Sequence, residues 1–299
     1  MLEKARGLPV DEAMLDLEDA VAPEAKESAR DNVVAALRDG DWRAPTVAVR
    51  VNDWGSAWLI HDVVDVVSAA GARLYCLVLP KVEAAHDVAA VDRLLGQTER
   101  DSDLVDGRIG IEVQIESALG LTNIDAIATA SSRIEALVFG PADFMASLNM
   151  RSLVVGEQPP GYDVGDAFHY PLMRILVAAR AYGLQAIDGP YLQVRDVDGF
   201  RRSARRAAAL GYDGKWVLHP DQVDPGNEVF SPSQDDYDKA EQILDAYAHA
   251  TSAGGGRRGA VMVGEEMIDE ASRKMALVVS AKGRAAGLAR TQSFTPPEA

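Results

Sequence analysis

Two acidic residues each follow a short apolar segment of the chain. Glu116 comes directly after residues 109–115, and Asp143 comes shortly after residues 136–139. Both segments are bounded by turn residues and contain Val or Ile, so they predict buried parallel strands, with a crossover helix between them over residues 123–130. Because the carboxyl ends of parallel strands open onto the same face of a sheet, we expect the two carboxylates to converge.

A pair of carboxylates with no nearby His or Cys suits a hard cation. Mg²⁺ prefers oxygen ligands and keeps several waters beside one or two carboxylates, and Mn²⁺ accepts similar ligands. Glu116 and Asp143 are therefore candidate metal ligands. The structural alternative is that one acid caps a helix while the other pairs with an arginine. The residues alone leave both interpretations open.

The rest of the chain repeats the pattern of a strand that ends in a polar group. Five further strands are predicted, and six of the seven are separated from the next by a helix; they cover residues 13–17, 46–51, 74–79, 185–187 and 215–218. The strand ends carry Glu18/Asp19, Arg50/Asn52, Lys81/Glu83, Glu116, Asp143, Asp188 and His219. A (β/α)₈ barrel takes catalytic residues from several strand ends, whereas a doubly wound sheet gathers them at one switch point. We therefore predict a (β/α)₈ TIM barrel over residues 1–228, with one strand unaccounted for.

Composition narrows the class of partner. A chain of 299 residues that is 47% hydrophobic and 25% charged is typical of a globular protein with a full core. The net charge of −16 argues against nucleic acid or an anionic membrane as partner, but not against a small anionic substrate. The lone Cys76 excludes an internal disulfide, and neither a membrane-length apolar run nor a signal segment is present, so we expect a cytoplasmic protein. A GxGxxG segment after the first strand and a P-loop are both absent.

Residues 229–299 are predicted to form a C-terminal helical extension. Ser233 precedes an acidic helix over residues 234–250, and a Gly- and Arg-containing linker over residues 252–259 leads to a second helix over residues 265–281. The tail from Thr291 is predicted to be disordered. Such an extension could pack on its own barrel or reach a neighbouring subunit.

Eight segments spread over about nine-tenths of the chain resemble one family. They are LDLEDAVAPEAKESAR (15–30), VRVN (49–52), LPKVE (79–83), IESALGL (115–121), FGPADF (139–144), LQAIDGPY (184–191), GYDGKWVLHPDQV (211–223) and FSPS (230–233). In order and spacing they are similar to the citrate lyase β-subunit/malyl-CoA lyase family, the acyl-CoA lyases of the HpcH/HpaI aldolase superfamily. The resemblance implies a (β/α)₈ barrel that uses Mg²⁺ to make or break a carbon–carbon bond between an acyl-CoA and a 2-oxo acid such as glyoxylate. The implied 3-hydroxyacyl-CoA is of the malyl-CoA or citramalyl-CoA type.

The resemblance also implies roles for individual residues. Glu116 and Asp143 match the family's metal ligands, and Arg50 matches the arginine that binds the oxo-acid carboxylate. The alternative for Arg50 is an ion pair with Glu18 or Glu83. The expected substrate-binding and orienting residues are Glu18, Asp19, Lys81 and Pro220.

The C-terminal segment of the family closes over the site of a neighbouring subunit. It brings an Asp in a "MID" context, which matches Met267-Ile268-Asp269 and makes Asp269 the candidate base for the acyl-CoA methyl group. The alternative for Asp269 is an ordinary acid in the first turn of an exposed helix. The family usually assembles as a homotrimer or a multiple of it, so we expect a trimer or hexamer.

One family feature does not match this sequence. Members usually begin with a strand of the type SxLFVPG before the helix that ends here near Leu8, and this is where the resemblance puts the unaccounted strand. Its absence from the numbered chain puts in doubt the contacts to acyl-CoA that its end would supply. Three other functions stay open: a malyl-CoA thioesterase, a citrate lyase β-like subunit acting on a carrier-bound substrate, and a non-enzymatic trimeric interaction protein.

Overall fold

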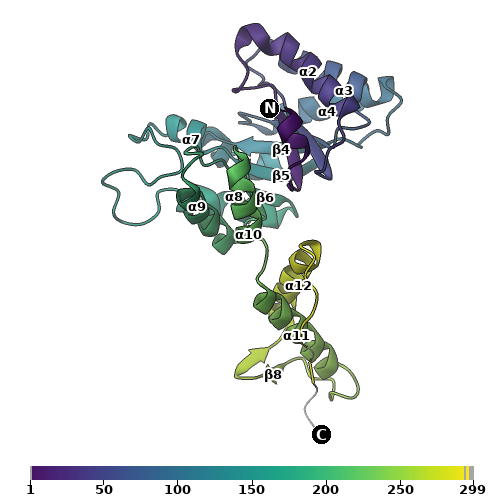
Figure 1. Ribbon diagram of the computed structural model, residues 1–299, viewed down its shortest axis with the longest axis vertical. Helices are drawn as coiled ribbons and strands as arrows, with labels where there is room; N and C mark the ends of the chain where they lie inside the picture. The colour runs from purple at the N-terminus through teal and green to yellow at the C-terminus, as the bar shows by residue number, and fades with distance from the viewer. Residues whose placement is uncertain (1, 293, 296–299) are drawn as a thin grey trace. The chain divides into compact units, whose positions relative to one another are not determined.

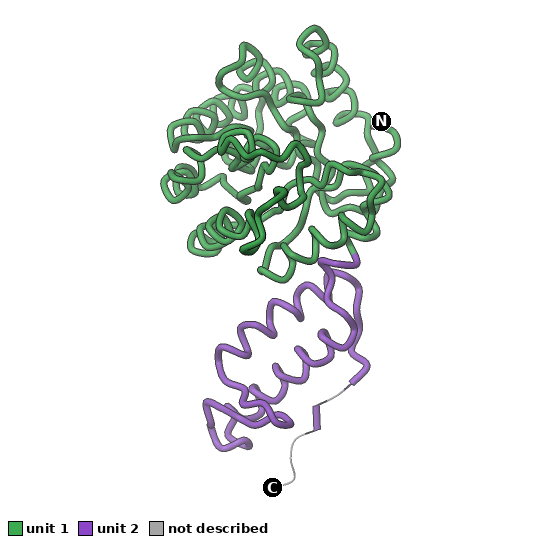
Figure 2. Tube along the Cα trace, turned by 90° about the vertical axis from the view of Figure 1, so that its left-hand side faces the viewer, with its two compact units in different colours: residues 1–227 green, residues 228–299 purple. Residues whose placement is uncertain are grey.

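The chain divides into two units in the computed structural model, which describes residues 2–292 and 294–295. The first unit comprises Met1–Asn227 and the second, here called the C-terminal unit, comprises Glu228–Ala299 (Figure 2). The boundary lies one residue before the predicted one.

The first unit is built on a single parallel sheet. Each strand pairs in parallel with the next along the chain, in the order β1 (Glu12–Asp16), β2 (Thr46–Arg50), β3 (Cys76–Leu79), β4 (Gly110–Ile115), β5 (Ile134–Phe139), β6 (Gln185–Asp188) and β7 (Gly214–Lys215). All residues of β3 and β4 are buried, as predicted for strands covered on both faces.

The sheet curls back on itself. Trp216, directly after β7, packs against the buried cluster of Ala48 from β2 with Cys76 and Val78 from β3, and its ring lies 5.6 Å from the Arg50 guanidinium. In a flat sheet β7 and β2 would be about 24 Å apart, at roughly 4.8 Å per strand. The fold is therefore an α/β fold whose seven-stranded sheet forms a curled half-barrel.

Helices connect and flank these strands. They are α1 (Leu2–Arg6), α2 (Lys26–Asp39), α3 (Leu59–Ala70), α4 (Ala85–Asp101), α5 (Ala118–Thr122), α6 (Ile124–Ala128), α7 (Pro141–Ser147), α8 (His169–Ala181), α9 (Val197–Leu210) and α10 (Val223–Phe230). Helices α2, α3 and α4 lie side by side along one flank of the sheet (Figure 1). No described helix is both long enough and apolar enough to cross a membrane.

Two predicted elements of the first unit differ in the structure. The crossover between β4 and β5 is two short helices, α5 and α6, because Asn123 between them leaves the helical conformation with ψ near 9°. The predicted strand 215–218 is reduced to β7 because the N–H of Leu218 donates to the side chain of Gln222 and Pro220 begins a 3₁₀ turn. Both differences come from side-chain hydrogen bonds or local turns that hydrophobic periodicity does not report.

The C-terminal unit contains two long helices and a hairpin. Helix α11 (Gln234–Thr251) was predicted, and Ser233 caps it by accepting a hydrogen bond from the N–H of Asp236. The predicted helix from residue 265 is wrong at its start, because β8 (Val261–Val263) and β9 (Glu266–Ile268) pair as an antiparallel hairpin before α12 (Glu270–Ala285). Gly264 adopts φ +59° in the turn, a conformation that glycine reaches without strain.

The prediction that the tail from Thr291 is disordered is wrong for its first two residues. The N–H of Thr291 donates to Asp238 at 2.9 Å, and the side chains of Gln242 and Gln292 are hydrogen-bonded to each other. Residues 293 and 296–299 lie outside the described residues.

Glu241 of α11 accepts hydrogen bonds from Ser280 and Arg284, which lower its pKa to about 2 although burial opposes this.

Two buried glutamates of the first unit have opposite environments. Glu99 is fully buried, and although burial raises its pKa, the Arg133 guanidinium and two backbone N–H groups lower it below the usual value. Glu112 lies near the amino ends of the strands, where burial and the neighbouring carboxylates of Glu12 and Glu135 raise its pKa well above the usual value.

We expect substitutions at these two positions to change stability in opposite directions. The folded state holds the proton of Glu112 more tightly than the unfolded state does, so its contribution to stability falls as pH rises above about 4.5. Glu112→Gln should therefore raise the free energy of unfolding at pH 8 by about 1–3 kcal/mol. Glu99→Gln breaks a buried ion pair and should lower it by about 3–5 kcal/mol. Urea unfolding at pH 5 and pH 8 tests both; a loss of stability in Glu112→Gln at pH 8 would contradict the assignment.

Candidate functional site

The two predicted metal ligands converge at the carboxyl end of the sheet. Glu116 follows β4 and is 2% exposed, and Asp143 lies in the first turn of α7, directly after β5. A Cβ atom at Gly140 would come within 2.4 Å of the Glu116 Cβ, so glycine is needed where the β5 loop crosses Glu116. Burial, helped by the nearby carboxylates of Asp143 and Glu18, raises the pKa of Glu116 to about 8.

Two donors orient the Glu116 carboxylate. The backbone N–H of Lys81 donates to Oε1 at 2.6 Å, and the side-chain amide of Gln114 donates to Oε2. Lys81 adopts a left-handed backbone with φ +52°, a conformation that costs energy for a residue with a side chain and is concentrated at functional sites. The turn after β3 therefore directs a main-chain donor at Glu116.

Arg50, the last residue of β2, is held mainly by Asp16. Nε and Nη2 donate to the two Asp16 oxygens at 2.8 and 2.6 Å, and Nη1 lies 3.0 Å from Glu18 Oε2 without the geometry of a hydrogen bond. The predicted alternative, an ion pair with Glu18, is therefore present. A guanidinium has five N–H groups, and the structure records no well-aligned acceptor among the described residues for those beyond the Asp16 pair. Arg50 can hold Asp16 and still offer N–H groups to a substrate carboxylate.

Asp16 was not among the site residues predicted from the sequence. It is the cross-strand partner of Arg50 in the β1–β2 register, and it shares a face of the chain with Glu18 because the two are separated by one buried residue, Leu17. The alternation in the segment LDLED was the available signal.

Glu18 lies between the two parts of the site, Arg50 on one side and Lys81 with Glu116 on the other. It is 3% exposed and lies between Arg50 and Lys81, whose ammonium group contacts Glu18 Oε1 and lies 3.3 Å from Asp19. Burial raises the pKa of Glu18, while Lys81 and Arg50 oppose that shift. The structure thus gathers Glu18, Asp19, Lys81, Arg50 and Glu116 at one end of the sheet.

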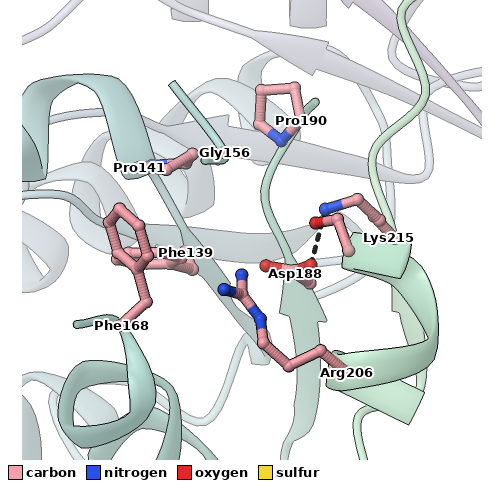
Figure 3. A pocket seen from close by; sticks show the side chains of 9 residues that line it. Phe139, Pro141, Gly156, Phe168, Asp188, Pro190, Arg206 and Lys215 are labelled. Atoms are coloured by element: carbon pink, nitrogen blue, oxygen red, sulfur yellow. Dashed lines mark hydrogen bonds and ion pairs between the residues drawn. The ribbon is translucent and has the colours of Figure 1, made fainter. Parts of the chain in front are cut away.

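A buried ion pair that was not predicted from the sequence lies at the ends of β6 and β7 (Figure 3). Lys215 Nζ lies 2.5 Å from both Asp188 Oδ2 and the carbonyl of Gly189, and burial lowers its pKa although Asp188 opposes this. A Cβ atom at Gly189 would come within 2.3 Å of Pro141. The pair therefore supports the loop that carries Asp143. A small cavity beside it is lined by Phe139, Pro141, Gly156, Phe168, Asp188, Pro190, Ser203, Arg206 and Lys215.

Two predicted site residues have local structural roles in the single chain. Pro220 begins a 3₁₀ turn, in which the His219 ring accepts a hydrogen bond from the N–H of Asp221. Asp269 is the N-terminal cap of α12 and accepts from the N–H groups of Ala271 and Ser272, which lower its pKa. Asp269 belongs to the C-terminal unit, whereas Glu116 and Asp143 belong to the first unit.

The donor set at Glu116 and Asp143 fits a hard divalent cation. Its carboxylate oxygens are the ligand type that Mg²⁺ prefers, and each Glu116 oxygen has a second lone pair beyond its one recorded hydrogen bond. A cation between the two acids would also stabilise the ionised form that burial and mutual repulsion now disfavour. A second group, Glu12, Cys76 and Glu112, has its ligand atoms within 4.8 Å of one another but lies near the amino ends of the strands.

Comparison with known proteins gives related sequences along most of the chain. The chain is 38% identical over 290 residues to an L-malyl-CoA/β-methylmalyl-CoA lyase of Cereibacter sphaeroides, covering 93% of this chain and 89% of the relative. It is 34% identical over 255 residues to a (3S)-malyl-CoA thioesterase of the same species, covering 85% and 81%.

Solved structures share the fold. A citrate lyase from Burkholderia xenovorans superposes with a TM-score of 0.83 at 26% identity and covers 97% of this chain and 88% of its own. CitE from Mycobacterium tuberculosis, in complex with magnesium, acetoacetate and coenzyme A, gives a TM-score of 0.69 at 27% identity, with 92% and 90% covered.

The family model described as HpcH/HpaI aldolase/citrate lyase matches residues 1–220 of the chain. These residues contain every strand of the curled sheet and the acids at its carboxyl end. Together with the 38% identity over most of the chain, this match establishes the family. The chain belongs to the HpcH/HpaI aldolase/citrate lyase family.

Proposed function

We propose that the protein is a Mg²⁺-dependent carbon–carbon lyase. It cleaves or forms a 3-hydroxyacyl-CoA of the malyl-CoA or citramalyl-CoA type, with an acyl-CoA such as acetyl-CoA and a 2-oxo acid such as glyoxylate as the other reactants. The observation that carries the proposal is the convergence of Glu116 and Asp143 at the strand ends. Glu18 and Lys81 link these acids to Arg50, which has N–H groups left to donate to a carboxylate. The similarity to a malyl-CoA lyase supports it.

In this proposal Glu116 and Asp143 hold the cation, with Mn²⁺ as a possible substitute for Mg²⁺. The bound cation supplies Lewis-acid chemistry at the oxygens of the oxo acid. Arg50 binds the oxo-acid carboxylate through the N–H groups that Asp16 does not use, since a guanidinium donates charge-assisted hydrogen bonds in a fixed plane. Glu18, Asp19 and Lys81 keep Arg50 and Glu116 in position, and Pro220 lines the rim.

The product of the reaction separates the lyase from two other functions. Purified protein with Mg²⁺ and malyl-CoA, then citramalyl-CoA, should release a 2-oxo acid and acetyl-CoA, and EDTA should abolish both. Free thiol with intact malate and no oxo acid would instead indicate a thioesterase, which the 34% identical relative keeps as the second candidate. No reaction on free CoA esters but cleavage of a carrier-bound ester would indicate a citrate lyase β-like subunit.

We also propose that Asp269 completes the site of a neighbouring subunit in a homotrimer or hexamer. There it would take the proton from the methyl carbon of acetyl-CoA in the synthetic direction, with the C-terminal unit covering that neighbour's site. The capping hydrogen bonds lower the pKa of Asp269 and so favour the ionised carboxylate, the form that accepts a proton, although they also weaken it as a base.

Mixing two inactive variants tests a shared site. Co-expressed in equal amounts, Asp143→Ala and Asp269→Ala should assemble into oligomers in which about a quarter of the sites combine an intact Asp143 with an intact Asp269 from a neighbour. Lyase activity should therefore return to roughly a quarter of the wild-type value. If each subunit uses its own Asp269, no mixed site is intact and no activity returns. Each variant alone is the control.

We also propose a finer architecture for the first unit. The outer edges of β1 and β7 have no strand partner among the described residues, and the sheet already curls far enough for Trp216 to reach β2. We propose that an eighth strand joins these edges in a closed (β/α)₈ barrel. A cytoplasmic location is proposed as well, because CoA thioesters are intracellular metabolites and the lone Cys76 is a free, buried thiol.

A further inference from the structure

A buried lysine lies behind the ends of β1 and β2. Lys26, the first residue of α2, is 5% exposed, and its ammonium group uses all three donors. Nζ donates to the carbonyls of Leu17 at 2.7 Å and Glu18 at 2.8 Å, and to Oδ1 of Asn52 at 2.7 Å. Its ammonium also lies 5.2 Å from the ring of Trp58. Three acceptors from two strand ends are thus tied to one side chain.

The partners of Lys26 belong to a closed polar network. The Asn52 side-chain amide donates to the Leu17 carbonyl at 3.0 Å and to Asp62, and the backbone N–H of Asn52 donates to Asp62 at 3.0 Å. Arg30 binds the other Asp62 oxygen through Nε at 3.0 Å and Nη2 at 2.9 Å. All four polar side chains are at least nine-tenths buried. A buried network in which each member is satisfied is rigid, and a missing member leaves the others unpaired at high cost.

This network ends at Glu18, the residue that lies between Arg50 and Lys81 in the site. Lys26 holds the backbone of Glu18, while the Glu18 side chain contacts Arg50 and Lys81. The backbone N–H of Lys81 in turn orients Glu116. A shift of the Leu17–Glu18 backbone would therefore move the support of both the carboxylate-binding arginine and a metal ligand.

We propose that Lys26 is a positioning residue for the lyase reaction, fixing the Leu17–Glu18 backbone so that Glu18 aligns Arg50 and Lys81. The inference rests on the proposed function. An apolar side chain at position 26 removes the donor that these groups share, in a place with little access to water. Asn52 Oδ1 then loses its recorded donor, while the Leu17 carbonyl keeps only the Asn52 amide and the Glu18 carbonyl only the N–H of Val21. The strand end relaxes, and the guanidinium of Arg50 loses its alignment with the substrate carboxylate.

Lys26→Met tests this role, with Arg133→Met as the matched control. Arg133 is a buried cation of the same unit, 8% exposed, but it pairs with Glu99 and Asp92 at the amino end of β5, away from the site. Lys26→Met should lower kcat/KM for the oxo acid about 10- to 100-fold, which is the usual range for residues that orient ligands through a second group. It should leave KM for the acyl-CoA within about twofold of the wild-type value. Arg133→Met should lower Tm at least as much and leave both KM values within about twofold.

Each outcome decides the inference. Lys26→Met with wild-type kinetics, or with the same kinetic change as Arg133→Met, would show that Lys26 contributes only to stability. If wild-type protein releases no oxo acid, the proposed function fails. Mn²⁺ titration by calorimetry still tests the positioning role in that case. Lys26→Met should bind Mn²⁺ about tenfold more weakly than wild type, because the Lys81 N–H is less well placed on Glu116. If Lys26→Met does not fold, Lys26→Arg keeps a buried donor for the two carbonyls and should show the same selective loss at smaller size.

Discussion

Asp143→Ala and Glu116→Gln are expected to lower kcat for oxo-acid release by at least about 10³-fold, on the order of 4 kcal/mol of transition-state stabilisation. Each change removes one of the two carboxylates that converge at the ends of β4 and β5, and a cation cannot be held tightly by the one that remains. Glyoxylate release from malyl-CoA measures the rate, and Mn²⁺ titration by calorimetry measures the affinity in the same samples.

The matched control for these acids is Glu83→Gln. Glu83 is an exposed acid two residues beyond Lys81, on the same rim. Its change removes a negative charge near the site without touching Glu116 or Arg50, so kcat should stay within about threefold of the wild-type value. Full activity in Asp143→Ala, or an equal loss in Glu83→Gln, would remove the metal-binding assignment.

Arg50→Lys is expected to raise KM for the oxo acid about 100-fold, or roughly 2.7 kcal/mol, with much less change in KM for the acyl-CoA. A lysine keeps the positive charge, but its compact ammonium cannot bind both Asp16 oxygens and a substrate carboxylate in one plane as Arg50 can. Initial rates in the synthetic direction, with glyoxylate and acetyl-CoA varied in turn, separate the two KM values.

Asp16→Asn separates substrate binding by Arg50 from its structural role. This change weakens the ion pair and leaves the guanidinium in place, so stability should fall while KM for the oxo acid rises less than about tenfold. If Asp16→Asn and Arg50→Lys raise that KM equally, the contribution of Arg50 is to hold the strand ends rather than the substrate.

The sequence was sufficient for the first six strands of the parallel sheet and for the end of the sheet at which the acids gather. Short apolar runs predicted β3, β4 and β5 closely, because both faces of a parallel strand are buried and few polar residues interrupt it. Glu116 and Asp143 could be paired because parallel strands end on one face. The antiparallel hairpin before Asp269 was missed because strands of three residues, one of them containing Glu266, give no clear alternation.

The missed features depend on register and on distant parts of the chain. Asp16 meets Arg50 only because β1 and β2 pair with those two residues opposite each other, 34 positions apart in sequence. In the sequence Lys26 is an ordinary helix-forming residue. Its role depends on the packing of α2 behind the strand ends, which brings its ammonium group to two carbonyls. Lys215 likewise gains its role only when β7 lies beside β6. Side chains that act through a neighbouring element leave little trace in local sequence patterns.

The most direct test of the account is the position of Mn²⁺ in crystals grown with Mn²⁺ and pyruvate, located by its anomalous scattering. The account predicts one strong peak about 2.0–2.3 Å from carboxylate oxygens of Glu116 and Asp143, with the pyruvate carboxylate turned toward Arg50. A peak at Glu12, Cys76 and Glu112 instead, or bound pyruvate with no metal beside Glu116, would contradict it.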